Sequence, residues 1–319
     1  MGIFKNKDQF EGYNIYSMKK YVDKKRMIFT ITAIIVVILT LALTIYYLVD
    51  TNIRIKKGKE FANQITEYEQ NQKKIEEQKE AERKAKIPQL TEAGKENLKN
   101  IYHSQEKIAY LTFDDGPSNN THEILDILKQ YNIKATFFVL GSQVQVFPET
   151  TNRIYNEGHY IANHGYSHKY SSIYQSPEQV LNEYNQCNEV VAKTINVPEY
   201  NSHLFRFPGG SVGGKYADLK KQAITLLDQN NILHIDWNSL TGDSEKANPT
   251  EEYLMDNLQK TTEGKNNLVV LMHDAQAKHI TVETLPKVIE YLQQQGYTFK
   301  NFYEIIKWNV FKINTRKCV

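Results

Sequence analysis

The segment IAYLTFDDGP, residues 108–117, passes directly from an apolar run into two neighbouring carboxylates, Asp114 and Asp115. The apolar run predicts a buried β-strand, which places both carboxylates at its carboxyl end. Residues 121–131 follow with apolar side chains at helical spacing. A strand, a polar turn and an amphipathic helix are the repeating unit of a parallel α/β fold, so we expect that fold class here.

The same alternation continues toward the C-terminus. The predicted strands are 108–113, 136–140, 204–207, 232–237 and 268–272, and the predicted helices are 121–131, 148–157, 177–195, 218–229, 250–261 and 282–294. About seven such units over roughly 200 residues predict a closed α/β barrel, somewhat short for eight regular repeats.

The N-terminal part of the chain contains a long uncharged stretch, residues 27–49, rich in Ile, Val, Leu and Ala. A helix of this length spans about 30 Å, the thickness of the hydrocarbon core of a bilayer. A cleaved signal peptide is the alternative, but its apolar core is usually about 7 to 15 residues and ends at small residues. This stretch ends in Tyr46, Tyr47, Leu48 and Val49. We therefore expect an uncleaved single-pass anchor.

Basic residues flank the stretch on both sides, so charge alone leans only weakly toward a cytoplasmic N-terminus. The near side carries Lys19, Lys20, Lys24, Lys25 and Arg26, and the far side carries Arg54, Lys56, Lys57 and Lys59. The interpretation divides the chain into a cytoplasmic segment (1–26), an anchor (27–49), a helical stalk (50–100) and a catalytic domain (101–319).

Residues 50–100 are polar and carry Glu-to-Lys pairs at helical spacing, which is typical of a solvated helix. Phe61, Ile65, Tyr68 and Ile75 outline a heptad seam that fails at Gln72 and Lys79, so an oligomer through the stalk is conceivable but not expected. Pro88 and Gly94 are predicted to break this helix.

The overall composition excludes some classes of function. The 319 residues carry a net charge of +2, and no basic stretch interleaved with aromatics follows the apolar segment, so we expect no nucleic-acid partner. Cys187 and Cys318 have no metal-ligand spacing and could pair only if the fold brought them within disulfide reach, so both are expected to be free thiols.

The chemically suggestive residues all follow strands. They are Asp114 and Asp115, His164, Arg206, Asp243 and His273. Each motif alone is more often a cap, a turn or a packing residue, but in a parallel α/β barrel the carboxyl ends of the strands meet at one site.

His164 and His168, four residues apart, would join Asp115 as three ligands of a zinc-like ion that keeps an open position for water. Asp114 then fits a general base and His273 a general acid. The same donors would also hold Co²⁺, Ni²⁺, Mn²⁺ or Fe²⁺.

Four motifs in this order make the chain resemble the polysaccharide deacetylases of the NodB-homology type, carbohydrate esterase family 4. They are residues 112–117, 163–168, 206–210 and 271–273. The resemblance covers residues 107–303 and implies a distorted (β/α) barrel. It also implies removal of acetyl groups from N-acetylated sugars, most often in peptidoglycan or chitin-like polymers.

The resemblance implies roles for individual residues. Asp115, His164 and His168 would be the metal ligands, Asp114 the base and His273 the acid. Arg206 would hold Asp114 in its charged form, which agrees with the physical effect of a guanidinium partner.

The resemblance also implies supporting roles for further positions. The backbone N–H of Gly209, after Pro208, would stabilise the oxyanion. Asp243 would orient His273, with Asp236 as the competing candidate. Trp237 and Leu271 would line an acetyl pocket, although strand-end core residues are the simpler explanation.

The chain departs from the family pattern at three positions. Gly165 stands where the family often has Ser or Thr after the first metal histidine, which puts the ordering of that loop in doubt. Gly209 replaces a common Tyr, so an aromatic wall is lost while the backbone donor stays. Ser244 replaces the usual Trp after the acidic residue.

Together these observations predict a membrane-anchored, outward-facing zinc deacetylase of N-acetylglucosamine in cell-wall peptidoglycan. The alternatives are a poly-N-acetylglucosamine, chitin-oligomer, N-acetylmuramic acid or O-acetyl ester substrate, or a catalytically idle carbohydrate-binding protein. The last would be expected to have lost at least one residue of the set, and none is missing.

Overall fold

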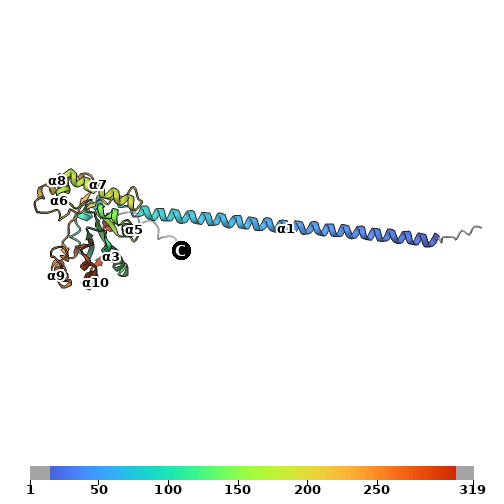
Figure 1. Cartoon of the computed structure of the whole chain (residues 1–319). Coiled ribbons are helices and arrows are strands. Elements are labelled where there is room, and N and C mark those ends of the chain that lie inside the picture. The colour runs from blue at the N-terminus through green and yellow to red at the C-terminus, as the bar shows by residue number, and fades with distance from the viewer. Residues whose placement is uncertain (1–14, 307–319) are drawn as a thin grey trace, which may run out of the picture. The chain divides into compact units, whose positions relative to one another are not determined.

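The computed structural model describes residues 15–306, and the chain divides into two compact units, residues 1–79 and 80–319. Helix α1 (Ile15–Ala85) is a single continuous helix of 71 residues (Figure 1). It contains no proline, which is consistent with its unbroken course. The predicted strand 108–113 is the first strand of the second unit.

Among the described residues, α1 is the one helix long and apolar enough to cross a membrane, with a mean hydropathy of 2.8 in its most apolar window. The hydroxyls within this part of the helix donate to carbonyls of the preceding turn, as in Thr30, Thr32, Thr40 and Thr44. Such internal bonds satisfy hydroxyl groups where no water is present.

The second unit is built on one curved parallel sheet. The strands are β1 (Ile108–Asp114), β2 (Thr136–Val139), β3 (Tyr160–Asn163), β4 (Leu204–Phe205), β5 (Leu233–His234), β6 (Ser239–Leu240), β7 (Asn267–His273) and β8 (Thr298–Phe299). Their order is β5-β4-β3-β2-β1-β7-β6, and β8 pairs with the start of β1. The fold is therefore α/β, a distorted (β/α) barrel.

Helices cover the outer face of this sheet (Figure 1). The longer ones are α3 (Asn119–Gln130), α5 (Pro148–Asn156), α7 (Pro177–Thr194), α8 (Ala217–Gln229), α9 (Glu251–Thr262) and α10 (His279–Gln294). The short ones are α2 (Glu92–Lys99), α4 (Gly141–Val146), α6 (Tyr170–Ile173) and α11 (Tyr303–Ile306).

Strand β1 is buried on both faces, which explains its unbroken apolar run. Leu111 and Phe113 belong to the large outer core beneath the helices, whereas Ile108 and Tyr110 belong to a second, inner cluster. This alternation follows from the two-residue repeat of a strand. The inner cluster includes Phe302, so the barrel interior is packed.

The expectation of a closed barrel is wrong. Strands β5 and β6 lie at the two ends of the sheet, and no ladder joins them among residues 15–306. The predicted strand 232–237 shortens to Leu233–His234. The guanidinium of Arg206 donates to the carbonyls of Ile235 and Asp236, at 3.2 Å each, and so takes acceptors that a neighbouring strand would use.

Residues 92–99 form a helix in the segment expected to be a stalk. Gly94 lies within this helix, so it does not end one. Leu98 is buried and packs in the inner cluster with Phe302 and Ile305. This part of the segment therefore packs against the sheet of the second unit.

Candidate functional site

The predicted site residues gather at the carboxyl edge of the sheet. Asp114 is the last residue of β1 and His273 the last of β7, and the two are register partners. His164 follows β3 directly, and Arg206 follows β4. Because all four strands run parallel, their side chains converge at one edge.

Asp115, His164 and His168 form a cluster that fits a metal ion, with one ligand atom from each lying within 4.8 Å of the others. The Oδ1 atom of Asp115 lies 3.5 Å from Nε2 of His164 and 3.4 Å from Nε2 of His168. Ligand atoms bound at about 2.0–2.1 Å to a tetrahedral zinc ion lie roughly 3.3 Å apart. The same Oδ1 atom is buried without a hydrogen-bond partner, which is expected of a ligand.

The local backbone holds these ligands in place. Asp115 and His168 both have positive φ, at 76° and 55°, a region that costs non-glycine residues energy and is concentrated at functional sites. Nδ1 of His164 lies 2.8 Å from the carbonyl oxygen of Arg206, which leaves Nε2 facing the cluster. Burial lowers the pKa of His164 to about 3, so the ring stays neutral and able to bind a metal.

A residue that sequence reasoning missed fixes the loop between the two histidines. Glu183 on α7 is buried, and it accepts hydrogen bonds from the backbone N–H groups of Tyr166 and Ser167 and from the Ser167 hydroxyl, each at 2.7 Å. The ordering that Gly165 put in doubt is therefore supplied from another element. The sequence did contain a signal for this residue, because Glu183 is an acidic side chain on the apolar face of the predicted helix 177–195.

Asp114 and Arg206 form a buried pair. Nη1 of Arg206 lies 2.8 Å from Oδ1 of Asp114, and the same nitrogen donates to the Thr112 hydroxyl. The guanidinium carbon lies 3.9 Å from the centre of the Phe138 ring. Burial raises the pKa of Asp114, and the Arg206 charge opposes that rise. Arg206 thereby fixes the direction of the Asp114 carboxylate and favours its charged form.

His273 pairs with Asp243. Nδ1 of His273 lies 2.7 Å from one carboxylate oxygen of Asp243, and its backbone N–H donates to the other. Asp236, the competing candidate, instead accepts from Ser211. Burial disfavours the imidazolium, but Asp243, helped by the charge of Asp114, outweighs burial and raises the pKa of His273 to about 9. The ring is therefore protonated at neutral pH.

Asp243 is itself held in the charged form. Burial favours its neutral form, yet the hydrogen bond and charge of His273 lower the pKa of Asp243 below its usual value. Thr281 also donates to it, at 2.7 Å. The pair is thus a carboxylate and an imidazolium in direct contact.

The structure also locates the remaining predicted site residues. Gly209 has a φ of 74°, and among the residues described no partner binds its backbone N–H. The carbonyl of Pro208 accepts from the Tyr174 hydroxyl at 2.6 Å. The Trp237 ring lies 5.8 Å from the Arg206 guanidinium, and Leu271 is buried on β7.

The histidines expected to be surface, loop or packing residues lie outside the metal-binding cluster, and so does Cys187. These histidines are His103, His122, His159, His203, His234 and His279. Cys187 is buried on α7, and its thiol donates to the carbonyl of Val139. Burial raises the pKa of that thiol. Cys318 lies outside the described residues.

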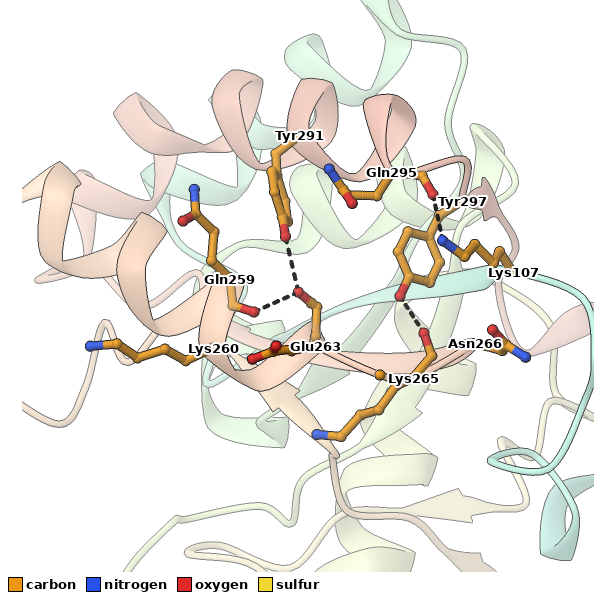
Figure 2. A pocket seen from close by; sticks show the side chains of 11 residues that line it. Lys107, Gln259, Lys260, Glu263, Lys265, Asn266, Tyr291, Gln295 and Tyr297 are labelled. Atoms are coloured by element: carbon orange, nitrogen blue, oxygen red, sulfur yellow. Dashed lines mark hydrogen bonds between the residues drawn. The ribbon is translucent and has the colours of Figure 1, made fainter.

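A separate polar cleft of about 570 Å³ lies at the opposite, amino edge of the sheet, beside Lys107 and Asn266 before β1 and β7 (Figure 2). The Lys107 amine donates to the carbonyl of Gln295, and the Tyr297 hydroxyl donates to that of Lys265. Its lining contains no histidine. We assign the chemistry to the carboxyl edge.

Comparison with known proteins agrees with this geometry. Residues 102–226 match the polysaccharide deacetylase family. A peptidoglycan-N-acetylglucosamine deacetylase of Bacillus cereus is 32% identical over 206 residues, 63% of this chain and 71% of that protein. A peptidoglycan-N-acetylmuramic acid deacetylase of Bacillus subtilis is 29% identical over 255 residues, 79% of this chain and 48% of that protein.

A solved structure extends the likeness to the fold. The catalytic domain of a peptidoglycan N-acetylglucosamine deacetylase from Eubacterium rectale superposes with a TM-score of 0.57 at 32% sequence identity. The match covers 62% of this chain and 90% of that domain. The chain belongs to the polysaccharide deacetylase family.

Proposed function

We propose that this chain removes N-acetyl groups from N-acetylglucosamine residues of cell-wall peptidoglycan. The observation that supports this best is the Asp115, His164 and His168 cluster, which has a base candidate, Asp114, and an acid candidate, His273, beside it. Amide hydrolysis needs this combination, because the attacking water must lose a proton and the departing amine must gain one.

A divalent ion held by the cluster would polarise the attacking water and the acetyl carbonyl. Asp114 takes the proton from that water, and Arg206 keeps the carboxylate directed at it. The backbone N–H of Gly209 donates to the oxyanion that forms at the carbonyl.

His273 completes the reaction by protonating the amine nitrogen as the carbon–nitrogen bond breaks. Asp243 stabilises the imidazolium and fixes its orientation. Trp237 lies in the segment between β5 and β6, and Leu271 lies on β7 two residues before His273. We propose that they form the wall for the acetyl methyl group.

We propose Zn²⁺ as the ion, because two imidazoles and one carboxylate with open positions suit a catalytic zinc site. Cobalt, nickel, manganese and iron accept the same donors, so metal availability in the cell also determines which ion the site holds.

N-acetylglucosamine is our choice of sugar because the glucosamine-type relative of Bacillus cereus is 32% identical to this chain, against 29% for the muramic-type relative. An N-acetylmuramic acid substrate is the second candidate, since that relative matches at a similar 29% identity.

We also propose that residues 27–49 anchor the chain, with residues 1–26 in the cytoplasm and residues 101–319 outside the cell. A tethered enzyme on the polar helix of residues 50–85 suits a fixed, insoluble wall polymer. Protease added to intact cells should remove the catalytic unit while sparing cytoplasmic markers. Protection of that unit until the membrane is opened would reverse the proposed orientation.

The enzymatic proposal is tested with the purified full chain loaded with Zn²⁺. Acetate release is measured from N-acetylglucosamine oligomers, purified peptidoglycan and acetylated xylan, and mass spectrometry of digested peptidoglycan identifies the deacetylated sugar. His168→Ala should abolish release, whereas His122→Ala, at an exposed position on α3, should not. Release from xylan alone, or from no substrate despite bound metal, would contradict the proposal.

A further inference from the structure

Tyr170 lies beside the metal cluster but has no role in the scheme above. It opens α6, two residues after His168, and its ring centre lies 5.6 Å from that of the His168 imidazole. Its side chain is partly exposed, at 41%. A tyrosine so close to a metal ligand and still open to solvent is placed to contact whatever approaches the ion.

The hydroxyl of Tyr170 reaches the loop that contains Gly209. A Cβ atom built on Gly209 would lie 2.4 Å from that hydroxyl oxygen and 3.2 Å from the carbon that bears it. Tyr170 therefore fills the space that a side chain at position 209 would take. The aromatic wall that appears lost at position 209 is supplied from α6.

Neighbouring contacts fix this arrangement. Tyr174, the C-cap residue of α6, donates to the carbonyl of Pro208, and its ring meets that of Tyr170 edge to face at 5.6 Å. Lys220 donates to the carbonyl of Gly210 and lies over the Tyr174 ring. The loop and α6 are thus attached to one another, so the position of the Tyr170 hydroxyl is set by packing.

The Tyr170 hydroxyl still has its hydrogen-bonding capacity. Within residues 15–306 no protein group bonds to it, and the backbone N–H of Gly209, in the loop that this hydroxyl reaches, is also unbonded. Two free donors on neighbouring segments, close to a metal ligand, form a site for an oxygen-rich ligand such as a sugar.

We propose that Tyr170 is a specificity residue that contacts the N-acetylated sugar, with its ring as one wall of the site and its hydroxyl hydrogen-bonded to the sugar. This inference rests on the proposed deacetylase function. The contact is made to the bound sugar as well as to the transition state, so it contributes mainly to substrate binding.

The test compares Tyr170→Phe and Tyr170→Ala with the wild-type full chain, using N-acetylglucosamine oligomers. Tyr170→Phe should raise KM roughly three- to ten-fold, the effect of one neutral hydrogen bond, with kcat nearly unchanged. Tyr170→Ala should raise KM further because the wall is also lost. Zinc affinity, measured by chelator competition, should stay at the wild-type value in both.

Each other result has a separate meaning. An inactive wild-type chain would contradict the proposed function itself. An active wild type with both variants at wild-type KM would overturn the specificity role. So would a fall in kcat at constant KM, or a loss of zinc affinity that parallels the loss of activity, because Tyr170 would then act on the oxyanion or through His168.

A double-mutant cycle tests the steric relation between Tyr170 and Gly209. Gly209→Ala introduces strain at a positive φ in any background, but the clash occurs only when Tyr170 is present. The loss of kcat/KM caused by Gly209→Ala should therefore be smaller in a Tyr170→Ala background. Equal losses in both backgrounds would show that the two positions are independent and would overturn this pairing.

Discussion

Asp114 and His273 are register partners at the ends of β1 and β7. Adjacent parallel strands lie about 4.8 Å apart, so these two side chains leave the sheet edge from neighbouring positions. Each has its own buried partner, Arg206 for Asp114 and Asp243 for His273. The edge thus holds a carboxyl group directed by a guanidinium and an imidazole held by a second carboxylate, the two kinds of group that hydrolysis with a base and an acid requires.

The first prediction concerns the pH profile. His273 is protonated below its pKa of about 9, so kcat/KM should fall as pH rises through that value. Asp243→Asn removes the main group that raises this pKa, so the alkaline limb should move toward 6.5 and the rate at neutral pH should drop. Asp236→Asn is the matched control and should leave the limb in place, because Asp236 bonds to Ser211 instead. An unmoved limb in Asp243→Asn would exclude His273 as the titrating acid.

The second prediction concerns stability. Arg206 is fully buried, so Arg206→Met leaves the Asp114 carboxylate without its partner. Removing one member of a buried ion pair costs about 3–5 kcal/mol. Adding Asp114→Asn should recover part of that loss, as a double-mutant cycle of urea unfolding in chelator would measure.

Arg153 offers a control for this cycle. It pairs with Asp126 and Glu157 near the surface, where ion pairs contribute about 0–1 kcal/mol. Arg153→Met should therefore destabilise the chain much less than Arg206→Met. Comparable losses would mean that the Arg206 pair contributes no more than a surface contact.

The long strands and the ligand set could be predicted because they depend on local pattern. Strand β1 is buried on both faces and shows an uninterrupted apolar run. The ligands Asp115, His164 and His168 come just after parallel strands, whose carboxyl ends meet at one edge. The open edge of the barrel could not be predicted, because two-residue strands such as β5 carry no periodicity.

The supporting residues depend on tertiary contacts between distant segments. Glu183 lies on α7, yet its partners are in the loop after β3. Tyr170 and Gly209 are 39 positions apart and become complementary only when α6 packs on the loop after β4. Neither contact produces a periodic pattern in the sequence, so both are visible only in the folded chain.

The third prediction follows from Glu183. Glu183→Ala removes three hydrogen bonds from the loop between the metal histidines, so zinc affinity should fall about 10- to 100-fold. Glu183→Gln keeps an acceptor and should retain most of the affinity. Glu189→Ala, an exposed acid on the same helix, is the matched control. Chelator competition on the full chain measures the affinity, and wild-type binding by Glu183→Ala would show that the loop is ordered without it.

The fourth prediction concerns acid stability. His159 is fully buried, and its Nδ1 accepts from the backbone N–H of Ala135 at 3.0 Å. Burial, with nearby Lys134 and Arg153, lowers its pKa to about 3, below the unfolded value of about 6.5. The unfolded chain therefore binds this proton more readily, so stability is present above pH 6.5 and is lost as pH falls toward 3.

The loss from this histidine should be about 2 kcal/mol at pH 5 relative to neutral pH. His159→Asn keeps an acceptor near the Nδ1 position but cannot titrate, so its unfolding free energy should depend less on pH between 7 and 5. His122→Asn, at an exposed position, should keep the wild-type dependence. If His159→Asn and the wild type lost equal stability on acidification, groups other than His159 would account for the acid sensitivity, and the proton would have to be accommodated in the folded state.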